Sequence, residues 1–304
     1  MSALASGGTL RGELRHDEPM ARHGGWRVGG PARRFFKPAD RADLVAFLAT
    51  LAPDEELHWV GLGSNLLVRD GGIDGTVICL QGTLDTVATL ADGRVRAEAG
   101  ATSAAVARHC ARAGLLGVEF LAGIPGTLGG ALAMNAGAHG DEIWQRVAGV
   151  ETADRSGRLY TRTPAEYRVA YRQVAGPADE WFLAATLQLD PGDPEEAQAR
   201  IRALLERRGA TQPTRQPTCG SVFKNPPGDF AGRLVEAAGL KGCRVGGASV
   251  STLHANFIVT EAGATAADVE ALIAQVQATV ARLHGVDLET EVRIVGRPAA
   301  GGEA

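Results

Sequence analysis

The chain has 304 residues, of which 45% are hydrophobic and 22% charged, and a formal net charge of -4 at pH 7. This is the composition of a globular protein long enough for two or three modest domains, and its negative charge argues against general binding to nucleic acid or to a membrane surface. No apolar run approaches the ~20 residues that span a bilayer, and the first residues lack an apolar signal core, so we expect a cytoplasmic protein.

The N-terminal third predicts a small βαβ unit. Residues 1 to about 22 show no periodicity and suggest a loose leader, after which Trp26–Pro31 opens the fold. Asp40 is placed to cap a helix that ends near Leu51, where Pro53 follows. Strands are expected on either side of this helix and beyond it, over Arg34–Pro38, Leu57–Val60 and Thr76–Leu80.

The middle of the chain is rich in strands with few helices, which favours an α+β fold over a regular doubly wound sheet. The Asp92-Gly93 turn predicts a hairpin, and a helix over Ser103–Ala113 ends at Gly114. The expected strands are Thr86–Leu90, Arg94–Ala99, Val147–Asp154, Arg158–Thr161 and Trp181–Leu189.

A separate, smaller α+β domain is predicted at the C-terminus. A polar helix over Glu195–Arg208, with Gly209 as its end, leads into the proline-punctuated link Thr211–Pro217, and we place a domain boundary in or just beyond this helix. The domain itself is expected to contain helices over Phe230–Ala238 and Ala266–His284, the second capped by Thr265, and strands over Asn256–Val259 and Leu288–Val295.

Two glycine-rich stretches offer bare backbone to a ligand. Leu121–Gly140 has too little side chain to form a core, and Gly61–Gly72 follows a strand and adds Ser64 and Asn65 as side-chain donors. The second stretch lacks both the lysine of GxxxxGK[ST] and the spacing of GxGxxG. Either loop alone is explained by tight turns, but together they suggest a dinucleotide held from two sides.

The segment around Ser221 suggests an anionic ligand. No GxSxG motif surrounds this serine, so a hydrolase nucleophile is a poor interpretation. Between Pro213 and Gly247 there are five basic residues and two acidic ones, in a protein of negative charge, which suggests an anionic ligand such as a diphosphate; a solvated face with accidental charge explains the segment equally well when it is taken alone. The four cysteines, Cys79, Cys110, Cys219 and Cys243, show no metal-binding spacing, so we expect reduced thiols and no metal site.

Two further segments carry charged residues but no pattern that marks them as a site. Tyr171-Arg172 is expected in a turn before the strand Trp181–Leu189. Alternation along the last strand places Glu289, Glu291 and Arg293 on one face, and such a charged face is usually the solvent side of a sheet. The residue pattern alone therefore does not select Glu291.

Six segments in this order resemble the UDP-N-acetylenolpyruvoylglucosamine reductases, flavoenzymes of peptidoglycan precursor synthesis. They are GLGSNLLVRDGG at 61–72, GIPGTLGGALAMNAGAHG at 123–140, AYR at 170–172, CGSVFKNP at 219–226, GLKGCRVGGASVSTLHANFIV at 239–259 and LETEVRIVG at 288–296. The resemblance extends from about residue 29 to 296, and the compact length resembles the family's shorter subclass, which lacks an inserted substrate-capping segment.

The resemblance implies an FAD-binding module of the vanillyl-alcohol-oxidase type over residues 23–195, in two subdomains of roughly 23–82 and 83–195. A connecting helix and linker over 196–212 would lead to a substrate-binding domain over 213–297 and a tail over 298–304. FAD would be bound non-covalently and reduced by NADPH. Hydride would then pass from flavin N5 to the enolpyruvyl ether of a UDP-sugar, giving UDP-N-acetylmuramate.

The family's catalytic residues map onto Ser221 as proton donor and onto Arg172 and Glu291, which would stabilise the developing negative charge. Tyr167-Arg168 is a rival position for the arginine, and Glu291 can help only if it carries a proton. The implied flavin contacts are Gly61, Gly63, Ser64, Asn65, Leu66, Gly123, Ile124, Pro125, Gly126, Thr127, Gly129, Gly130, Asn135, Gly137 and Arg293. The implied substrate contacts are Lys224, Asn225, Arg215, His254 and Asn256.

Two alternatives stay open. One is an FAD-dependent oxidase or dehydrogenase of the same flavin fold, in which His139 would hold the flavin covalently. The other is a non-catalytic protein that binds nucleotide sugars, which would be colourless.

Overall fold

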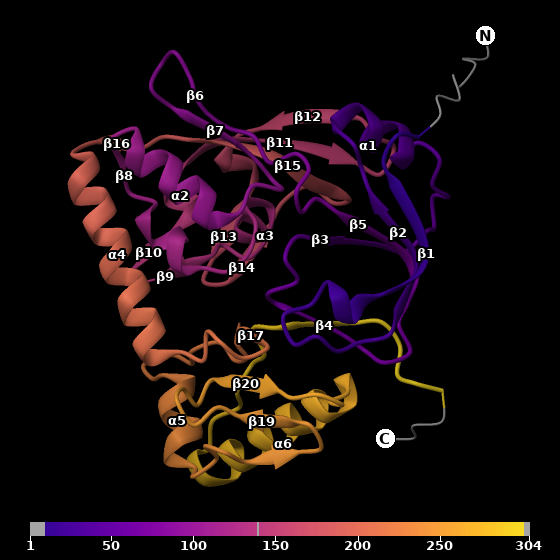
Figure 1. The fold of residues 1–304 in the computed structure, drawn as a ribbon, viewed down its shortest axis with the longest axis vertical. Coiled ribbons are helices and arrows are strands. Elements are labelled where there is room, and N and C mark those ends of the chain that lie inside the picture. Colours follow the sequence, from indigo (N-terminus) through magenta and orange to yellow (C-terminus); the bar gives the residue numbers. More distant parts are fainter. Residues whose placement is uncertain (1–9, 139, 301–304) are drawn as a thin grey trace.

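The computed structural model describes residues 10–138 and 140–300, which form three parts (Figure 1). In the first part, β2 (Pro31–Lys37) and β3 (Leu57–Val60) both pair in parallel with β5 (Ile73–Cys79). Helix α1 (Arg41–Leu48) connects β2 to β3, and the Asp40 carboxylate caps it by accepting from the backbone N–H of Asp43. The predicted βαβ unit is therefore confirmed, with β5 between its two strands.

The expected loose leader is wrong for much of its length. Strand β1 (Glu13–Pro19) pairs antiparallel with β2, and the 3₁₀ turn η1 (Met20–Arg22) buries Met20. This strand has no alternation of apolar residues, and polar contacts hold it instead. Glu18 accepts from Arg15 at 2.9 Å and pairs with His23 at 2.8 Å. An edge strand with such side chains resists pairing with other chains.

The second part is a five-stranded antiparallel sheet in the order β12-β11-β15-β7-β6, packed against α2 (Ser103–Arg112) and α3 (Leu128–Ala133) over one hydrophobic core. Its strands are β6 (Val87–Thr89), β7 (Val95–Glu98), β11 (Val147–Asp154), β12 (Leu159–Arg162) and β15 (Glu180–Leu187). Smaller elements surround it: β8 (Leu115–Leu116), η2 (Glu119–Gly123), β9 (Gly137–Ala138), β10 (Asp141–Glu142), η3 (Ile143–Arg146), η4 (Pro164–Glu166), β13 (Arg168–Ala170), β14 (Gln173–Ala175) and β16 (Asp190–Pro191).

Helix α4 (Pro194–Thr211) runs along the edge of the molecule from the second part to the third (Figure 1). The predicted end at Gly209 is wrong, because the helix continues for two more residues through it. None of the helices within residues 10–138 and 140–300 is long and apolar enough to cross a membrane.

The third part is a four-stranded sheet in the order β17-β20-β19-β18, covered by α5 (Ala231–Ala237) and α6 (Ala266–His284). Its strands are β17 (Thr218–Ser221), β18 (Arg244–Val245), β19 (Ala248–Val250) and β20 (Phe257–Thr260). Thr265 forms the predicted cap of α6, as part of a capping box with Asp268. The sequence predicted both helices and β20 but not the short strands around them.

The first and third parts share a core. Trp26, only 1% exposed, packs among the apolar side chains of the third part, and its indole N–H donates to the Ile258 carbonyl at 2.8 Å. Both carboxylate oxygens of Asp70 accept from the first two backbone N–H groups of α6, each at 2.9 Å. Arg69 makes a two-pronged ion pair with Glu270 of the same helix.

The end of the chain joins this assembly as β21 (Arg293–Val295), which pairs in parallel with β4 (Leu66–Val68). The predicted strand Leu288–Val295 is shorter than expected, because its first half pairs irregularly with the segment after β17. The Glu291 N–H donates to the Val222 carbonyl at 2.8 Å, and Thr290 forms an isolated bridge with Phe223. This pairing places Glu291 beside the end of β17.

Candidate active site

A cavity of about 420 Å³ lies where the three parts meet. It is lined by the two glycine-rich loops, by the end of β17 and by the segment that leads into β21. Of the residues predicted to bind flavin, the lining includes Gly61, Gly63, Ser64, Asn65, Leu66, Gly123, Ile124, Pro125, Gly126, Thr127, Gly130, Gly137 and Arg293. The sequence therefore identified most of this wall.

The two glycine-rich loops touch each other. The Ser64 hydroxyl donates to the Pro125 carbonyl at 2.6 Å. At Gly61 a Cβ atom would stand 2.3 Å from the Thr127 hydroxyl oxygen and 3.1 Å from its Cβ, so only glycine allows this approach. The loops form one continuous cradle made of backbone.

The cradle fits a flat, polar cofactor. A Cβ at Gly123 would find only the Arg208 side chain at 3.9 Å, and one at Gly130 only the Thr127 hydroxyl at 3.9 Å, so both glycines leave open space. Ser103, the first residue of α2, also lines the cavity, and its buried hydroxyl has no hydrogen-bond partner among the described residues. Such a hydroxyl is a free partner for a ligand that enters the cradle.

Two predicted flavin contacts do not line the cavity. A Cβ at Gly129 would lie 3.0 Å from the Cβ of Ala99, so this glycine allows α3 to pack closely on the neighbouring strand. Asn135 is fully buried, and its amide donates to Glu142 at 2.7 Å and to the Ala170 carbonyl at 3.1 Å. Both residues support the loop from behind.

Arg172 reaches the cavity from the tip of the β13–β14 hairpin, in the turn that the sequence predicts. Its Nε donates to the Glu291 carboxylate at 3.0 Å, and its two terminal nitrogens donate to the carbonyls of Asn135 and Gly137 at 3.3 and 2.7 Å. Its rival Arg168 is exposed on β13. The geometry therefore favours Arg172 over Arg168 as the arginine of the site.

Ser221 is the last residue of β17 and lines the same cavity. Beneath it, the buried thiol of Cys219 lies 3.5 Å from the carbonyls of both Gly63 and Leu66, and burial raises the pKa of this thiol to about 11. The strand that carries Ser221 thus rests directly on the first glycine-rich loop.

Glu291 does not face solvent as a charged strand face would suggest. Its side chain is 17% exposed, and burial raises the pKa of its carboxyl above the usual value even though Arg172 and Lys224 act to lower it. A raised pKa favours the protonated form, which is the form that could support developing negative charge.

The residues predicted to bind substrate lie outside this cavity. The Lys224 ammonium pairs with Glu289 at 2.5 Å, and Arg215 is exposed in the link after α4. The Asn225 side chain accepts from the backbone N–H of Ala231 at 3.1 Å, at the start of α5. Of these, Lys224 is near enough to lower the pKa of Glu291 although it does not line the cavity itself.

Asn256 and His254 have structural partners. The buried Asn256 amide bonds both the N–H and the carbonyl of Phe223, at 3.0 and 2.8 Å, and so secures the segment after Ser221. The His254 ring accepts from the Asn256 N–H at 3.2 Å, and burial lowers the pKa of His254.

Sequence reasoning missed Arg208 and Gln212, which line the cavity from the end of α4. Arg208 Nε donates to the Gln212 side chain at 3.2 Å, and no carboxylate pairs with this guanidinium in the described part of the chain. Burial lowers the pKa of Arg208. Residues four positions apart lie on the same face of a helix, and this spacing could have placed Arg208 and Gln212 together. The predicted helix end at Gly209 put the two residues in different elements.

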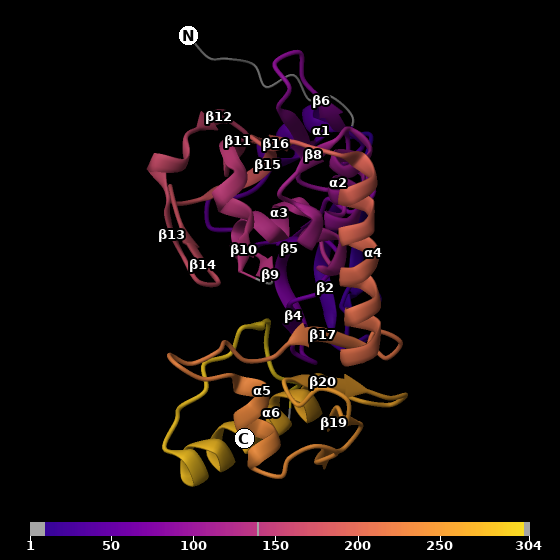
Figure 2. The same cartoon turned by 90° about the vertical axis from the view of Figure 1, so that its left-hand side faces the viewer.

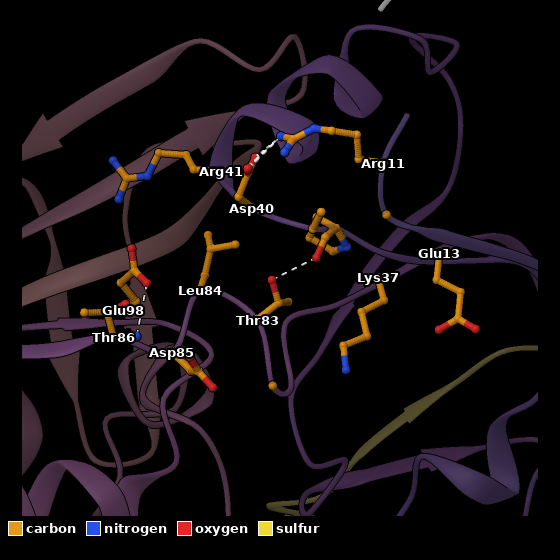
Figure 3. A pocket seen from close by; sticks show the side chains of 14 residues that line it. Arg11, Glu13, Lys37, Asp40, Arg41, Thr83, Leu84, Asp85, Thr86 and Glu98 are labelled. Carbon is orange, nitrogen blue, oxygen red and sulfur yellow. Dashed lines mark hydrogen bonds and ion pairs between the residues drawn. The ribbon is translucent and has the colours of Figure 1, made fainter. Parts of the chain in front are cut away.

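A larger hollow of about 690 Å³ lies beside α1 and shares no lining residue with the first cavity. Figure 3 shows the ion pair between Arg11 and Asp40, at 2.6 Å. The Thr83 hydroxyl in the same hollow donates to the backbone carbonyl of Pro38 at 2.8 Å. The residue on which the covalent-oxidase alternative depended, His139, lies outside the described residues.

Comparison with known families first defines the class. Residues 32–162 match the FAD binding domain family, and this match together with the glycine cradle makes the protein an FAD-containing oxidoreductase. Residues 212–295 match the family described as UDP-N-acetylenolpyruvoylglucosamine reductase, C-terminal domain.

Whole-chain relatives define the particular family. The chain is 62% identical over 285 residues to the UDP-N-acetylenolpyruvoylglucosamine reductase of Alkalilimnicola ehrlichii, covering 94% of this chain and 95% of the relative. It is 58% identical to that of Methylococcus capsulatus, over 98% of each chain. The crystal structure of the Thermus caldophilus reductase superposes with a TM-score of 0.80 at 33% identity, covering 94% of this chain and 99% of that one. The chain belongs to the UDP-N-acetylenolpyruvoylglucosamine reductase family, as its motifs predicted.

Proposed function

We propose that this protein reduces the enolpyruvyl ether of UDP-N-acetylglucosamine-enolpyruvate to UDP-N-acetylmuramate, with NADPH as the hydride donor. The observation that carries the proposal is the meeting of Arg172, Glu291 and Ser221 on one cavity that is also lined by the bare backbone of two glycine-rich loops. NADPH and UDP-sugars are metabolites of the cytoplasm, which supports a cytoplasmic location.

The glycine cradle would hold the flavin. The loops at Gly61–Leu66 and Gly123–Gly130 offer backbone N–H groups for its diphosphate and a flat surface for its ring system. The Ser103 hydroxyl, which has no partner among the described residues, would add a polar contact. A bound flavin supplies two-electron chemistry by accepting a hydride from one substrate and delivering it to another.

Arg172 would bind the carboxylate of the enolpyruvyl group. Reduction of the double bond transfers negative charge onto that carboxylate, and a planar guanidinium can stabilise it through two parallel hydrogen bonds. Three hydrogen bonds already fix the Arg172 side chain, which reduces the reorganisation needed at the moment of reaction.

Glu291 would act in its protonated form. A bare carboxylate beside the developing charge would raise the barrier, whereas a protonated one donates a hydrogen bond to it. The burial that raises the pKa of Glu291 supports this assignment. Substrate binding adds further negative charge and would raise the pKa again.

Ser221 would donate the proton to the carbon next to the one that receives the hydride. An ordinary hydroxyl is a weak acid, so this role requires a strongly basic carbon and a positive charge close by. Lys224 follows on the same segment, three residues later, and contributes to that charge. Arg208, a cavity cation without a carboxylate partner among the described residues, would take a phosphate or carboxylate of a bound molecule.

One experiment tests the function as a whole. The purified protein is reduced by NADPH without oxygen and then mixed with UDP-N-acetylglucosamine-enolpyruvate. We expect return of the oxidised flavin absorbance and formation of UDP-N-acetylmuramate, whereas flavin that stays reduced would contradict the proposal. Acid precipitation separates the oxidase alternative, because non-covalent flavin remains in the supernatant and covalent flavin enters the pellet.

A further inference from the structure

The hairpin that carries Arg172 has little packing to hold it. Every residue of β13 is exposed, and in β14 only Val174 packs against the core of the second part. Figure 2 shows this hairpin at the edge of the second part, extending toward the third. The position of Arg172 must therefore depend on polar contacts near the turn.

The turn is also strained. Arg172 has φ +53°, a left-handed conformation that is unfavourable for a non-glycine residue. Such a conformation persists only where surrounding contacts determine it. The neighbouring Tyr171 is 45% exposed, so burial at the tip does not supply those contacts.

Asn135 supplies two of these contacts, beside the Glu291 carboxylate and the Gly137 carbonyl, which also accept from the guanidinium. Its side-chain amide donates to the carbonyl of Ala170, two residues before Arg172, and its own backbone carbonyl accepts from the Arg172 guanidinium. One residue thus holds both the backbone of the turn and the head of the side chain that the turn presents.

Asn135 is itself fixed on every side. It is 0% exposed, the Glu142 carboxylate accepts from its amide, and its side-chain oxygen accepts from the Trp144 N–H at 3.4 Å. It too has a left-handed backbone, φ +43°, which asparagine tolerates better than most residues. Its side chain has no unused polar atom to offer a flavin.

We propose that Asn135 is a positioning residue that holds Arg172 in reach of Glu291 and the substrate carboxylate, and that it does not bind the cofactor. The inference rests on the proposed role of Arg172 in the reaction with the enolpyruvyl substrate. Asn135 acts only through Arg172, so its loss has no effect on a protein that already lacks the guanidinium.

The test compares Asn135→Gly with Arg172→Ala and the double variant. Glycine accepts the left-handed backbone and keeps the carbonyl but removes the amide. We expect normal FAD content and normal reduction by NADPH, with reoxidation by the enolpyruvyl substrate slowed ~10- to 100-fold, because displacement of a catalytic group by about 1 Å has effects of this order. The double variant should be no slower than Arg172→Ala alone.

Two further variants control for loss of packing. Asn135→Asp keeps the size and the acceptor for Trp144 but replaces the two amide donors by at most one O–H, for which the Glu142 carboxylate is a better acceptor than the Ala170 carbonyl, so it should show the same reoxidation defect if Asn135→Gly does not fold. Trp144→Phe keeps an aromatic ring against Tyr167 at the base of the hairpin but removes the 2.8 Å indole hydrogen bond to the Leu132 carbonyl in α3, and it should reoxidise normally.

The outcomes separate this inference from the function on which it rests. If Arg172→Ala reoxidises at the wild-type rate, the proposed role of Arg172 is wrong. If Arg172→Ala is slow while Asn135→Gly and Asn135→Asp are not, or if the Asn135 variants lose FAD, the positioning role alone is overturned. Additive losses in the double variant would also overturn it.

Discussion

Gly61→Ala offers a direct test of the glycine cradle. The added Cβ would stand 2.3 Å from the Thr127 hydroxyl oxygen and 2.8 Å from its methyl carbon. Thr127 is buried and directly precedes α3, so the two loops must separate to make room for the added Cβ. Overpacking of this kind costs ~1–3 kcal/mol. If this strain falls on the flavin-bound state, FAD binds about 5- to 150-fold more weakly, since 1.4 kcal/mol corresponds to a factor of about ten.

The assay is a fluorescence titration of the flavin-free protein with FAD. Gly209→Ala is the matched control, because a Cβ there meets nothing within 4 Å inside helix α4, and it should bind FAD normally. Thr127→Ala added to Gly61→Ala removes both clashing atoms, so the double variant should recover to the FAD affinity of Thr127→Ala alone. Wild-type affinity in Gly61→Ala would refute the close approach of the two loops, and failure of the double variant to recover would place the strain elsewhere.

Three further predictions concern the reaction. Ser221→Ala should bind FAD and be reduced by NADPH normally but lose ~10²–10⁴-fold in reoxidation by the enolpyruvyl substrate, as followed by stopped-flow absorbance; equal impairment of both half-reactions would make Ser221 a structural residue. Because the pKa of Glu291 is raised in the folded protein, stability falls as pH rises from the ordinary value of 4.5 through the raised one. Glu291→Gln should remove this slope in urea titrations at about pH 4 and about pH 8, whereas an unchanged slope would argue against a raised pKa. Reoxidation should slow at the pH where Glu291 loses its proton, and Lys224→Ala should move that pH upward, because Lys224 lowers the pKa of Glu291; the variant should also weaken substrate binding. Lys241→Ala, which removes a lysine paired with Glu236 at 2.7 Å, is the control and should change neither property.

The sequence predicted those features that depend on local chemistry. Asp40 and Thr265 start their helices as expected because capping needs only neighbouring backbone groups. The glycine loops were recognised because bare backbone is a property of composition. Motif order then identified Ser221, Arg172 and Glu291, which the residue pattern alone did not select.

What the sequence did not predict depends on distant partners. Strand β1 exists because β2 offers an edge and because ion pairs to Glu18 replace apolar burial. The burial of Glu291 comes from the segment after β17, about 70 residues away in the chain, and so does the loss of regular strand pairing before Arg293. Asn135 was expected at the flavin because it lies in a glycine-rich motif, while its side-chain amide bonds Glu142, seven residues further on, and the distant carbonyl of Ala170.

The burial of Trp26 has a consequence for how the protein is made. Its partner Ile258 is 232 residues away, so the ribosome must add that length of chain before the indole can reach its final surroundings. At about 5–20 residues per second this takes roughly 12–46 s. For most of that interval the first glycine-rich loop lacks the β17 strand beneath it, because Thr218–Ser221 is made only shortly before Ile258, and the finished cradle exists only after synthesis of the last strand. We expect nascent chains released before Arg293 to bind no FAD, so cofactor uptake would follow completion of the chain.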